Sequence, residues 1–391
     1  MTRTLPFDYA IRNLGRRPFR TLLTALSSAL VAALLVATTA FVRGLGQTFS
    51  GAAQPDTAIL LSTVAERDVV RSTVSAGLPE LVAASVPGVR SIGSTPAVSA
   101  EIHMGTTLHL GSADQNDPRE FAAFVRGVTE RAFLVHEAVT LIEGRPPRTG
   151  EVIVGQLVAE QLGADPSELA LGRKLRFEGS EFEIVGRFSA PGTTIEAEIW
   201  TPLAELRGLT KRDDSSVVFV RMQSPDDFGA LELFTRRRLD LELMMIPSSV
   251  YYRELSEYFA PIRAMAWAMA ALIAAGAIFG GANTLNAAVQ DRLRELAALR
   301  AVGYSGLAIV RSLAQEALVL AALGAVIGLA LARLFIAGGA VRIAMSAFSL
   351  RVDAIAVLVG FGGALLLGLF GTAPAALRVL RMPIAAALKE I

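Results

Sequence analysis

The chain has 391 residues, of which 52% are hydrophobic and 19% are charged, and its net charge is +1. Soluble domains carry roughly 25% charged residues, so this composition favours a membrane protein. The sequence has no cysteine, which excludes disulfides, thiolate catalysis and cysteine-bound zinc. Its arginines are scattered around apolar runs and do not form the basic stripe that a nucleic-acid-binding protein needs.

Four apolar runs predict transmembrane helices, because the hydrocarbon core of a bilayer takes about 20 helical residues. These runs are residues 21–42, 264–290, 311–333 and 354–377. The first run is long and lacks a clean small-residue cleavage site, so we expect an anchor rather than a cleaved signal peptide. The third run reaches full length only if Arg311 and Arg333 extend their side chains toward the lipid headgroups.

Arginines cluster in the N-terminal residues 1–20, in a segment at 291–310 and in a tail at 378–391. In a four-helix protein these three segments fall on one side of the membrane. Positively charged segments stay in the cytoplasm, so both termini are expected there. The opposite loop, 334–353, also holds arginines, which leaves the charge bias incomplete.

Residues 43–263, between the first two runs, have the composition of a folded domain and face outward if both termini face inward. Alternating or β-branched stretches predict strands at 151–155, 174–179, 181–188 and 215–222. Helices with Pro, Gly or Asp at their edges are predicted at 79–86, 156–163 and 231–240. The predicted fold class is a membrane α-helical protein with four transmembrane helices and a large extracytoplasmic α+β domain inserted between helices 1 and 2. A domain of this length can bury its own core.

The charged segment between the second and third runs reads RLRELAALRAVGYSG, residues 292–306. It predicts a short helix with Leu293, Leu296 and Leu299 on one face, ended by Gly303 in the left-handed conformation. The charged residues around that face are Arg292, Arg294, Glu295 and Arg300. Apolar anchors ringed by charge suit docking into a groove on a soluble partner. The alternative is a loop helix that lies on the lipid headgroups.

Two G-x-x-x-G pairs lie within the apolar runs, Gly276/Gly280 and Gly324/Gly328. This spacing predicts close helix packing, without indicating which pair faces another protomer. Glu316, near the cytoplasmic start of the third run, is expected to anchor the structure there rather than to bind an ion or substrate.

The chain has three histidines, and two of them, His103 and His109, could share one face of a strand with Glu101. Their spacing matches no usual metal-ligand pattern, so a surface strand is favoured and no metal site is expected. The domain contains no legible Ser/His/Asp, Ser/Lys or paired-carboxylate arrangement. We therefore predict no catalytic residue in this chain.

Five stretches, in order along the chain, resemble permeases of MacB/FtsX-type ABC transporters. The stretch AIRNLGRRPFRTLLTALSSALVAALLV is similar to their N-terminal amphipathic helix and first transmembrane helix, and residues 141–188 to the outer-domain signature of the MacB and LolC/LolE branch. RLRELAALRAVGYS resembles their coupling segment and RSLAQEALVLAALGAVIGLALA their third helix. APAALRVLRMPIAAALKEI is similar to their terminal segment.

The resemblance implies a permease subunit that works with a separate ATPase, since the sequence has no G-x-x-x-x-G-K-[ST] phosphate loop. ATP and magnesium would be bound by that ABC ATP-binding subunit, and its groove would receive the coupling segment. The resemblance also implies a second permease protomer, identical or different, in the lipids of the bacterial inner membrane. A periplasmic membrane-fusion adaptor is left open.

In permeases of this type, closure of the ATPases is passed to the outer domains, which is called mechanotransmission. The expected function is export of a lipophilic, peptide or drug-like substrate. The alternatives are lipoprotein release, as by LolC/LolE, and FtsX-like regulation of a cell-wall hydrolase without transport. The length of residues 43–263 argues against the last of these, because FtsX-like permeases usually have a much smaller outer domain.

Overall fold

The computed structural model describes residues 15, 18–111, 119–336, 338–343 and 346–381. The predicted N-terminal helix at 1–20 and the predicted tail at 378–391 lie mostly outside the described residues. The chain divides into two compact units. The helical unit comprises Met1–Arg43, Pro261–Gly339 and Leu350–Ile391, and the α/β unit comprises Gly44–Ala260 and Ala340–Ser349.

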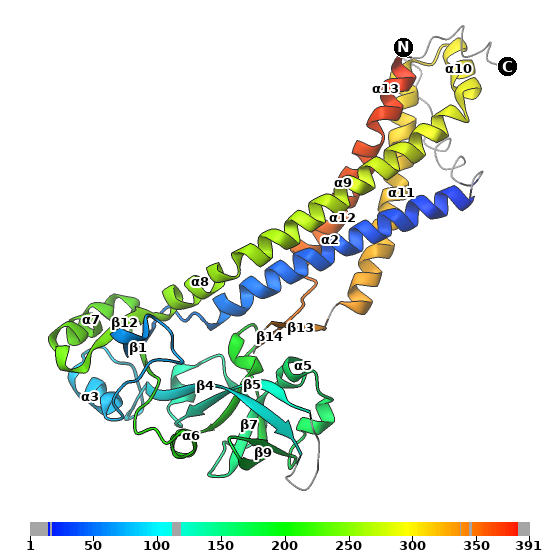
Figure 1. The fold of residues 1–391 in the computed structure, drawn as a ribbon. Helices are drawn as coiled ribbons and strands as arrows, with labels where there is room; N and C mark the ends of the chain where they lie inside the picture. The colour runs from blue at the N-terminus through cyan, green and yellow to red at the C-terminus, as the bar shows by residue number, and fades with distance from the viewer. Residues whose placement is uncertain (1–14, 16–17, 112–118, 337, 344–345, 382–391) are drawn as a thin grey trace. The chain divides into compact units, whose positions relative to one another are not determined.

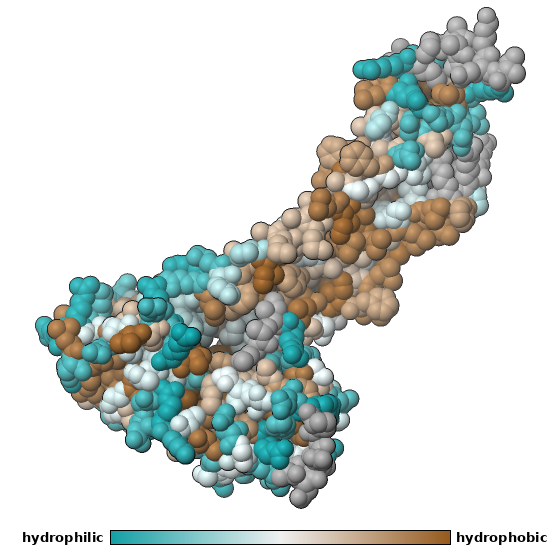
Figure 2. Space-filling view, viewed as in Figure 1, coloured by the Kyte–Doolittle hydropathy of each residue, from teal (hydrophilic) through white to brown (hydrophobic). Residues whose placement is uncertain are grey.

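Four helices of the described residues are long and apolar enough to cross a membrane, as predicted. They are α2 (Pro18–Ala52), α9 (Ala260–Gln290), α11 (Gly306–Phe335) and α12 (Ala354–Gly371), the last continued by α13 (Ala373–Arg381). Figure 2 shows hydrophobic side chains along these helices, as lipid contact requires. The short helix α10 (Leu293–Ala301) lies between α9 and α11 in the sequence (Figure 1).

The pair Gly324/Gly328 packs α11 directly against α2. A Cβ at Gly324 would lie 2.5 Å from the carbonyl oxygen of Ala25, and one at Gly328 would lie 2.3 Å from that of Ala29. Both distances are too short for any side chain, so the two backbones approach each other only because these positions are glycine. This pair therefore serves packing within the chain.

The α/β unit is built on one ten-stranded mixed sheet, in the order β12-β1-β11-β4-β5-β10-β7-β9-β6, with β8 pairing to β4 and β9. The strands are β1 (Thr57–Ser62), β4 (Val98–Leu110), β5 (Phe121–Val128), β6 (Thr140–Gly144), β7 (Glu151–Gly155), β8 (Lys174–Phe177), β9 (Ser180–Ser189), β10 (Ile199–Pro202), β11 (Val217–Arg221) and β12 (Leu243–Pro247). Its helices are α3 (Leu78–Ser85), α4 (Ala132–Val135), α5 (Val158–Leu162), α6 (Leu203–Thr210), α7 (Phe228–Arg237) and α8 (Ser248–Tyr258). These include all the strands and helices predicted for this region, with small shifts at their ends.

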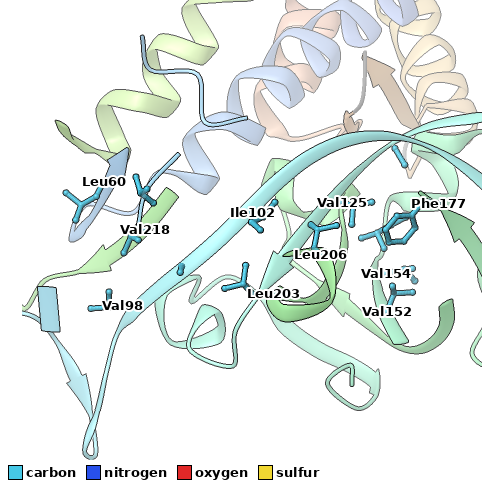
Figure 3. Close-up of a cluster of buried hydrophobic side chains, with 14 of the residues drawn as sticks. Leu60, Val98, Ile102, Val125, Val152, Val154, Phe177, Leu203, Leu206 and Val218 are labelled. Carbon is cyan, nitrogen blue, oxygen red and sulfur yellow. The ribbon is translucent and has the colours of Figure 1, made fainter. Parts of the chain in front are cut away.

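Strand β9 illustrates why these residues form a sheet with a buried face. Phe182 and Ile184 alternate with more exposed residues and are buried in the main core, as expected for a strand with one face turned inward. The register against β7 then shifts between Ile184 and Gly186, and Phe188 is buried in a second cluster with Trp200. Figure 3 shows the main core, where Ile102 and Val125 of neighbouring strands lie near Leu206 of α6. Burial of such side chains is the main favourable term in folding.

Strands β1 and β12 lie at one edge of the sheet and connect it to the long helices. They pair antiparallel, with Ala58 opposite Pro247. At that end the backbone N–H of Gln54 donates to Ser248 Oγ (3.0 Å), and the Ser248 hydroxyl donates to the carbonyl of Gln54 (2.8 Å). The residues that follow α2 are thus fastened to the first residue of α8.

The loop predicted at 334–353 contains a small hairpin of β13 (Ala340–Ile343) and β14 (Ser346–Ser349). The hairpin belongs to the α/β unit, although α11 and α12 on either side of it belong to the helical unit. The sequence interpretation of 334–353 as a plain outer loop missed this element.

Candidate functional site

Helix α10 contains most of the residues predicted to couple the chain to a partner. It ends in a Schellman motif, in which the N–H of Tyr304 donates to Leu299 O (3.1 Å) and the N–H of Gly303 donates to Arg300 O (3.0 Å). Gly303 has φ = 104°, so the predicted left-handed terminator is confirmed. Ser305 then caps α11 by accepting a hydrogen bond from the N–H of Ala308 (3.1 Å). The turn between α10 and α11 is therefore tightly defined.

The predicted apolar face of α10 is turned toward the chain itself. Leu296 is 2% exposed and Ala297 is fully buried, and Leu293 and Leu299 pack around them. Together they contact a cluster from α9, α11 and α13, which consists of Leu285, Val289, Ile309, Leu313, Ala317, Ala375 and Val379. Neighbouring helices of the same unit therefore cover Leu296, which the sequence interpretation assigned to a partner's groove.

The exposed side of α10 presents a different set of residues. We define the loop surface as the exposed side chains of α10, of the following turn and of the start of α11, which are Arg294, Glu295, Ala298, Ala301, Val302 and Leu307. Val302 and Leu307 are 64% and 70% exposed. The charged residues at its edge, Arg294 and Glu295, were predicted as part of the site, whereas its apolar residues were not.

Arg292 was expected at the rim of the site, but its side chain is 7% exposed. It contacts Glu295 (3.3 Å) and Glu316 of α11 (3.5 Å). Arg300 is half-buried, and its Nη1 donates to the carbonyl of Val379 in α13 (3.4 Å). These two arginines hold α10 to its neighbours, and Glu316 has the anchoring contact expected of it.

The second glycine pair, Gly276/Gly280, is open within the described part of the chain. A Cβ at either glycine would meet no described atom within 4 Å. Both line a cavity of about 410 Å³ between α2, α9, α11 and α12. Unlike Gly324/Gly328, this pair makes no close helix contact inside the described chain.

The α/β unit holds a buried charge cluster, which we define as Glu101, His103, Arg126, His136, Glu198 and Trp200. Arg126 donates to Glu101 (Nη1 to Oε2, 2.7 Å) and forms two hydrogen bonds to Glu198 (2.6 and 2.5 Å). The indole N–H of Trp200 also donates to Glu198 (2.9 Å). His136 Nε2 lies 2.7 Å from Glu101 Oε1, and His103 Nε2 lies 3.3 Å from Glu101 Oε2.

Strand pairing brings this cluster together. His103 of β4 lies opposite Arg126 of β5, which lies opposite Trp200 of β10. The three side chains therefore share one face of adjacent strands. His109, which was considered as a metal ligand together with Glu101 and His103, lies opposite Arg176 of β8 instead. Within the described residues, no group of three or more His, Asp or Glu side chains is placed to hold a metal ion.

Burial and neighbouring charges shift the pKa values of this cluster. Burial opposes ionisation of Glu101, but the charges of His136 and Arg126 and the hydrogen bonds from both histidines hold the pKa of this carboxyl well below its usual value. Burial, followed by the charge of Arg126, lowers the pKa of His103. Burial opposes the charge on Arg126, yet Glu198 and Glu101 together raise its pKa. The cluster is thus built around an ionised Glu101 and a neutral His103.

We expect the α/β unit to lose stability as the pH falls. Below about pH 6.5 the unfolded chain protonates His103 before the folded chain does, and below about pH 4.3 the same holds for Glu101. Where the unfolded state binds more protons than the folded state, the free energy of unfolding decreases as the pH is lowered, by up to about 1.4 kcal/mol per pH unit for one group. Thermal unfolding of the full chain in detergent, followed through fluorescence of buried Trp200, should show this decline, and His103→Phe should weaken it near pH 6. A melting temperature that rises on acidification would contradict the prediction.

Comparison with known proteins finds two family models along the chain. The model for the MacB-like periplasmic core domain matches residues 21–232, and the model for the FtsX-like permease C-terminal region matches residues 267–384. A comparison with curated proteins found no match.

Two solved structures are similar to this chain. The periplasmic region of MacB from Actinobacillus actinomycetemcomitans is 14% identical, with a TM-score of 0.39, and the match covers 52% of this chain and 94% of that region. The extracellular domain of the noncanonic ABC-type transporter YknZ from Gram-positive bacteria is 15% identical, with a TM-score of 0.36, and the match covers 49% of this chain and 99% of that domain.

Proposed function

Since the chain belongs to the MacB/FtsX family of ABC transporter permeases, we propose that it couples a separate ATP-binding subunit to motion of its α/β unit. In this proposal the α/β unit lies outside the cytoplasmic membrane and both termini lie in the cytoplasm. ATP and magnesium are bound by the partner subunit. The motion drives export of a lipophilic, peptide or drug-like substrate.

The observation that carries this proposal is the packing of α10 against its neighbouring helices. Its inward face joins one apolar cluster with α9, α11 and α13, so a displacement of α10 acts on three helices at once. The loop surface leaves Val302 and Leu307 exposed, together with the charged residues Arg294 and Glu295. Exposed apolar side chains accompanied by charges are typical of a protein interface, and we assign the ATP-binding subunit as its occupant because the family is that of ABC permeases.

A second permease protomer fits the open side of α9. The most apolar part of this helix has few residues buried inside the chain, and its side chains Met269, Leu272 and Phe279 are 61%, 73% and 76% exposed. We therefore propose α9 as the dimer surface.

Among the three family roles, the size of the α/β unit supports export or lipoprotein release over hydrolase regulation. Its sheet has ten strands and its own buried core. A unit of this size can present a surface to a substrate, and it is much larger than the outer domain expected of an FtsX-like permease.

The loop surface can be tested with Val302→Asp. A carboxylate placed in a contact that becomes buried costs about 3–5 kcal/mol, so the ATP-binding subunit should bind at least about 100-fold more weakly. The measurement is co-purification of the ATP-binding subunit with the full chain in mild detergent. The matched control is Val64→Asp, which introduces the same charge at a 76% exposed site of the α/β unit. Equal recovery of the ATP-binding subunit with both variants would rule out the loop surface as its docking site.

A further inference from the structure

The hairpin β13–β14 is held by the α/β unit through several independent contacts. Ala347 and Phe348 are 0% and 3% exposed, and the hairpin packs against α5 and the 3-10 turn η3 (Thr194–Ala197). Arg342 Nη1 donates to the carbonyl of Leu162 at the end of α5 (3.2 Å). A hairpin of two four-residue strands is at best marginally stable alone, so these contacts are what order it.

Gly44 in α2 makes room for the hairpin. A Cβ at this position would lie 3.0 Å from both the Phe348 ring and the carbonyl oxygen of Ser349. The helix and the hairpin therefore touch through backbone and ring, and a branched side chain at Gly44 would push them apart. The strand that carries Phe348 therefore packs against α5 and η3, and the Phe348 ring lies against Gly44 of α2.

Short connections join the hairpin to the membrane helices. Residues 336–339 connect it to α11, and residues 350–353 connect it to α12, with the N–H of Leu350 donating to Gly339 O (2.7 Å). A connection of this length spans at most about 14 Å. The hairpin consequently cannot move far from the ends of α11 and α12 while it stays attached to the α/β unit.

We propose that β13–β14 is a docking element that links α11 and α12 to the α/β unit, as a third connection beside α2 and α8–α9. Its docking surface consists of α5, η3 and Gly44. The route starts at α10, follows the 30-residue helix α11 and reaches α5 through Phe348 and Arg342. This inference rests on the proposed coupling function and adds a specific path to it.

The test is hydrogen–deuterium exchange, read by mass spectrometry, on the full chain in complex with its ATP-binding subunit, with and without ATP and vanadate. In the wild type, ATP should change exchange both in the hairpin and in α5. Phe348→Ala should raise exchange of the hairpin amides about 100-fold, as expected for loss of a buried ring, and should abolish the response of α5 to ATP. Gly44→Val should also raise exchange of the hairpin amides and abolish the response of α5 to ATP, because it displaces the ring without removing it.

The matched control is Phe219→Ala, which removes an equally buried ring from a cluster of β1, β11 and β12 that contains no residue of α5. This variant should loosen the core but keep the response of α5 to ATP. The inference is overturned if α5 still responds in both Phe348→Ala and Gly44→Val, or if Phe348→Ala leaves exchange of the hairpin unchanged. Absence of any ATP response in the wild-type α/β unit would instead refute the proposed coupling function, and with it the inference that rests on that function.

Discussion

Replacing Arg126 by methionine is expected to destabilise the α/β unit by about 3–5 kcal/mol, because Glu101 and Glu198 would be left buried without their shared cation. Both carboxylates are almost fully buried, so water cannot replace the lost hydrogen bonds. The measurement is unfolding of the full chain in detergent, followed through Trp200, whose indole donates to Glu198.

The interpretation can be checked with a rescue and a control. Adding Glu101→Gln and Glu198→Gln to Arg126→Met removes the uncompensated charges and should restore part of the stability. Arg145→Met breaks an exposed pair with Glu151 and should cost about 0–1 kcal/mol. If Arg126→Met behaves like Arg145→Met, the buried charge cluster is not a stabilising unit.

The second large effect is expected for Leu296→Asp. The structure places Leu296 inside the packing of α9, α10, α11 and α13, so the new carboxylate would be buried in an apolar cluster at a cost of several kcal/mol. We expect a lower melting temperature of the full chain even when no ATP-binding subunit is present.

The matched control on the same helix is Ala298→Asp, since Ala298 is exposed. This variant should fold like the wild type and show its defect only when the ATP-binding subunit is added. A normal melting temperature for Leu296→Asp combined with loss of the ATP-binding subunit would indicate that Leu296 contacts the partner and not the helices of its own chain.

The contrast between Leu296 and Ala298 shows what the sequence could predict about the site. Periodicity identified the helix, its apolar face and the Gly303 terminator, because these depend on local spacing. It could not decide whether the apolar face turns toward the chain or toward a partner. That choice depends on α9, α11 and α13, whose packing is set by long-range contacts.

The buried charge cluster was missed for a related reason. Glu198 is far from Arg126 and His136 in the sequence, and charged residues are rarely fully buried. Only the pairing of β4, β5 and β10 places His103, Arg126 and Trp200 side by side. The hairpin at 340–349 did carry a local signal in the β-branched residues of AVRI, but this signal is short and lies within a stretch interpreted as an outer loop.

The arrangement of β1 and β12 sets the mechanical response of the α/β unit to its two long helices. Because α2 leads into the start of β1 and α8 leaves from the end of β12, both helices meet this strand pair at the same end, beside the Gln54–Ser248 hydrogen bonds. Spreading the helices apart would load those terminal bonds first and peel the strands one pair at a time. Sliding one helix past the other along the strand direction would load all the β1–β12 hydrogen bonds in shear at once. The β1–β12 pair therefore resists sliding along the strand direction more strongly than opening from the end that carries the Gln54–Ser248 bonds.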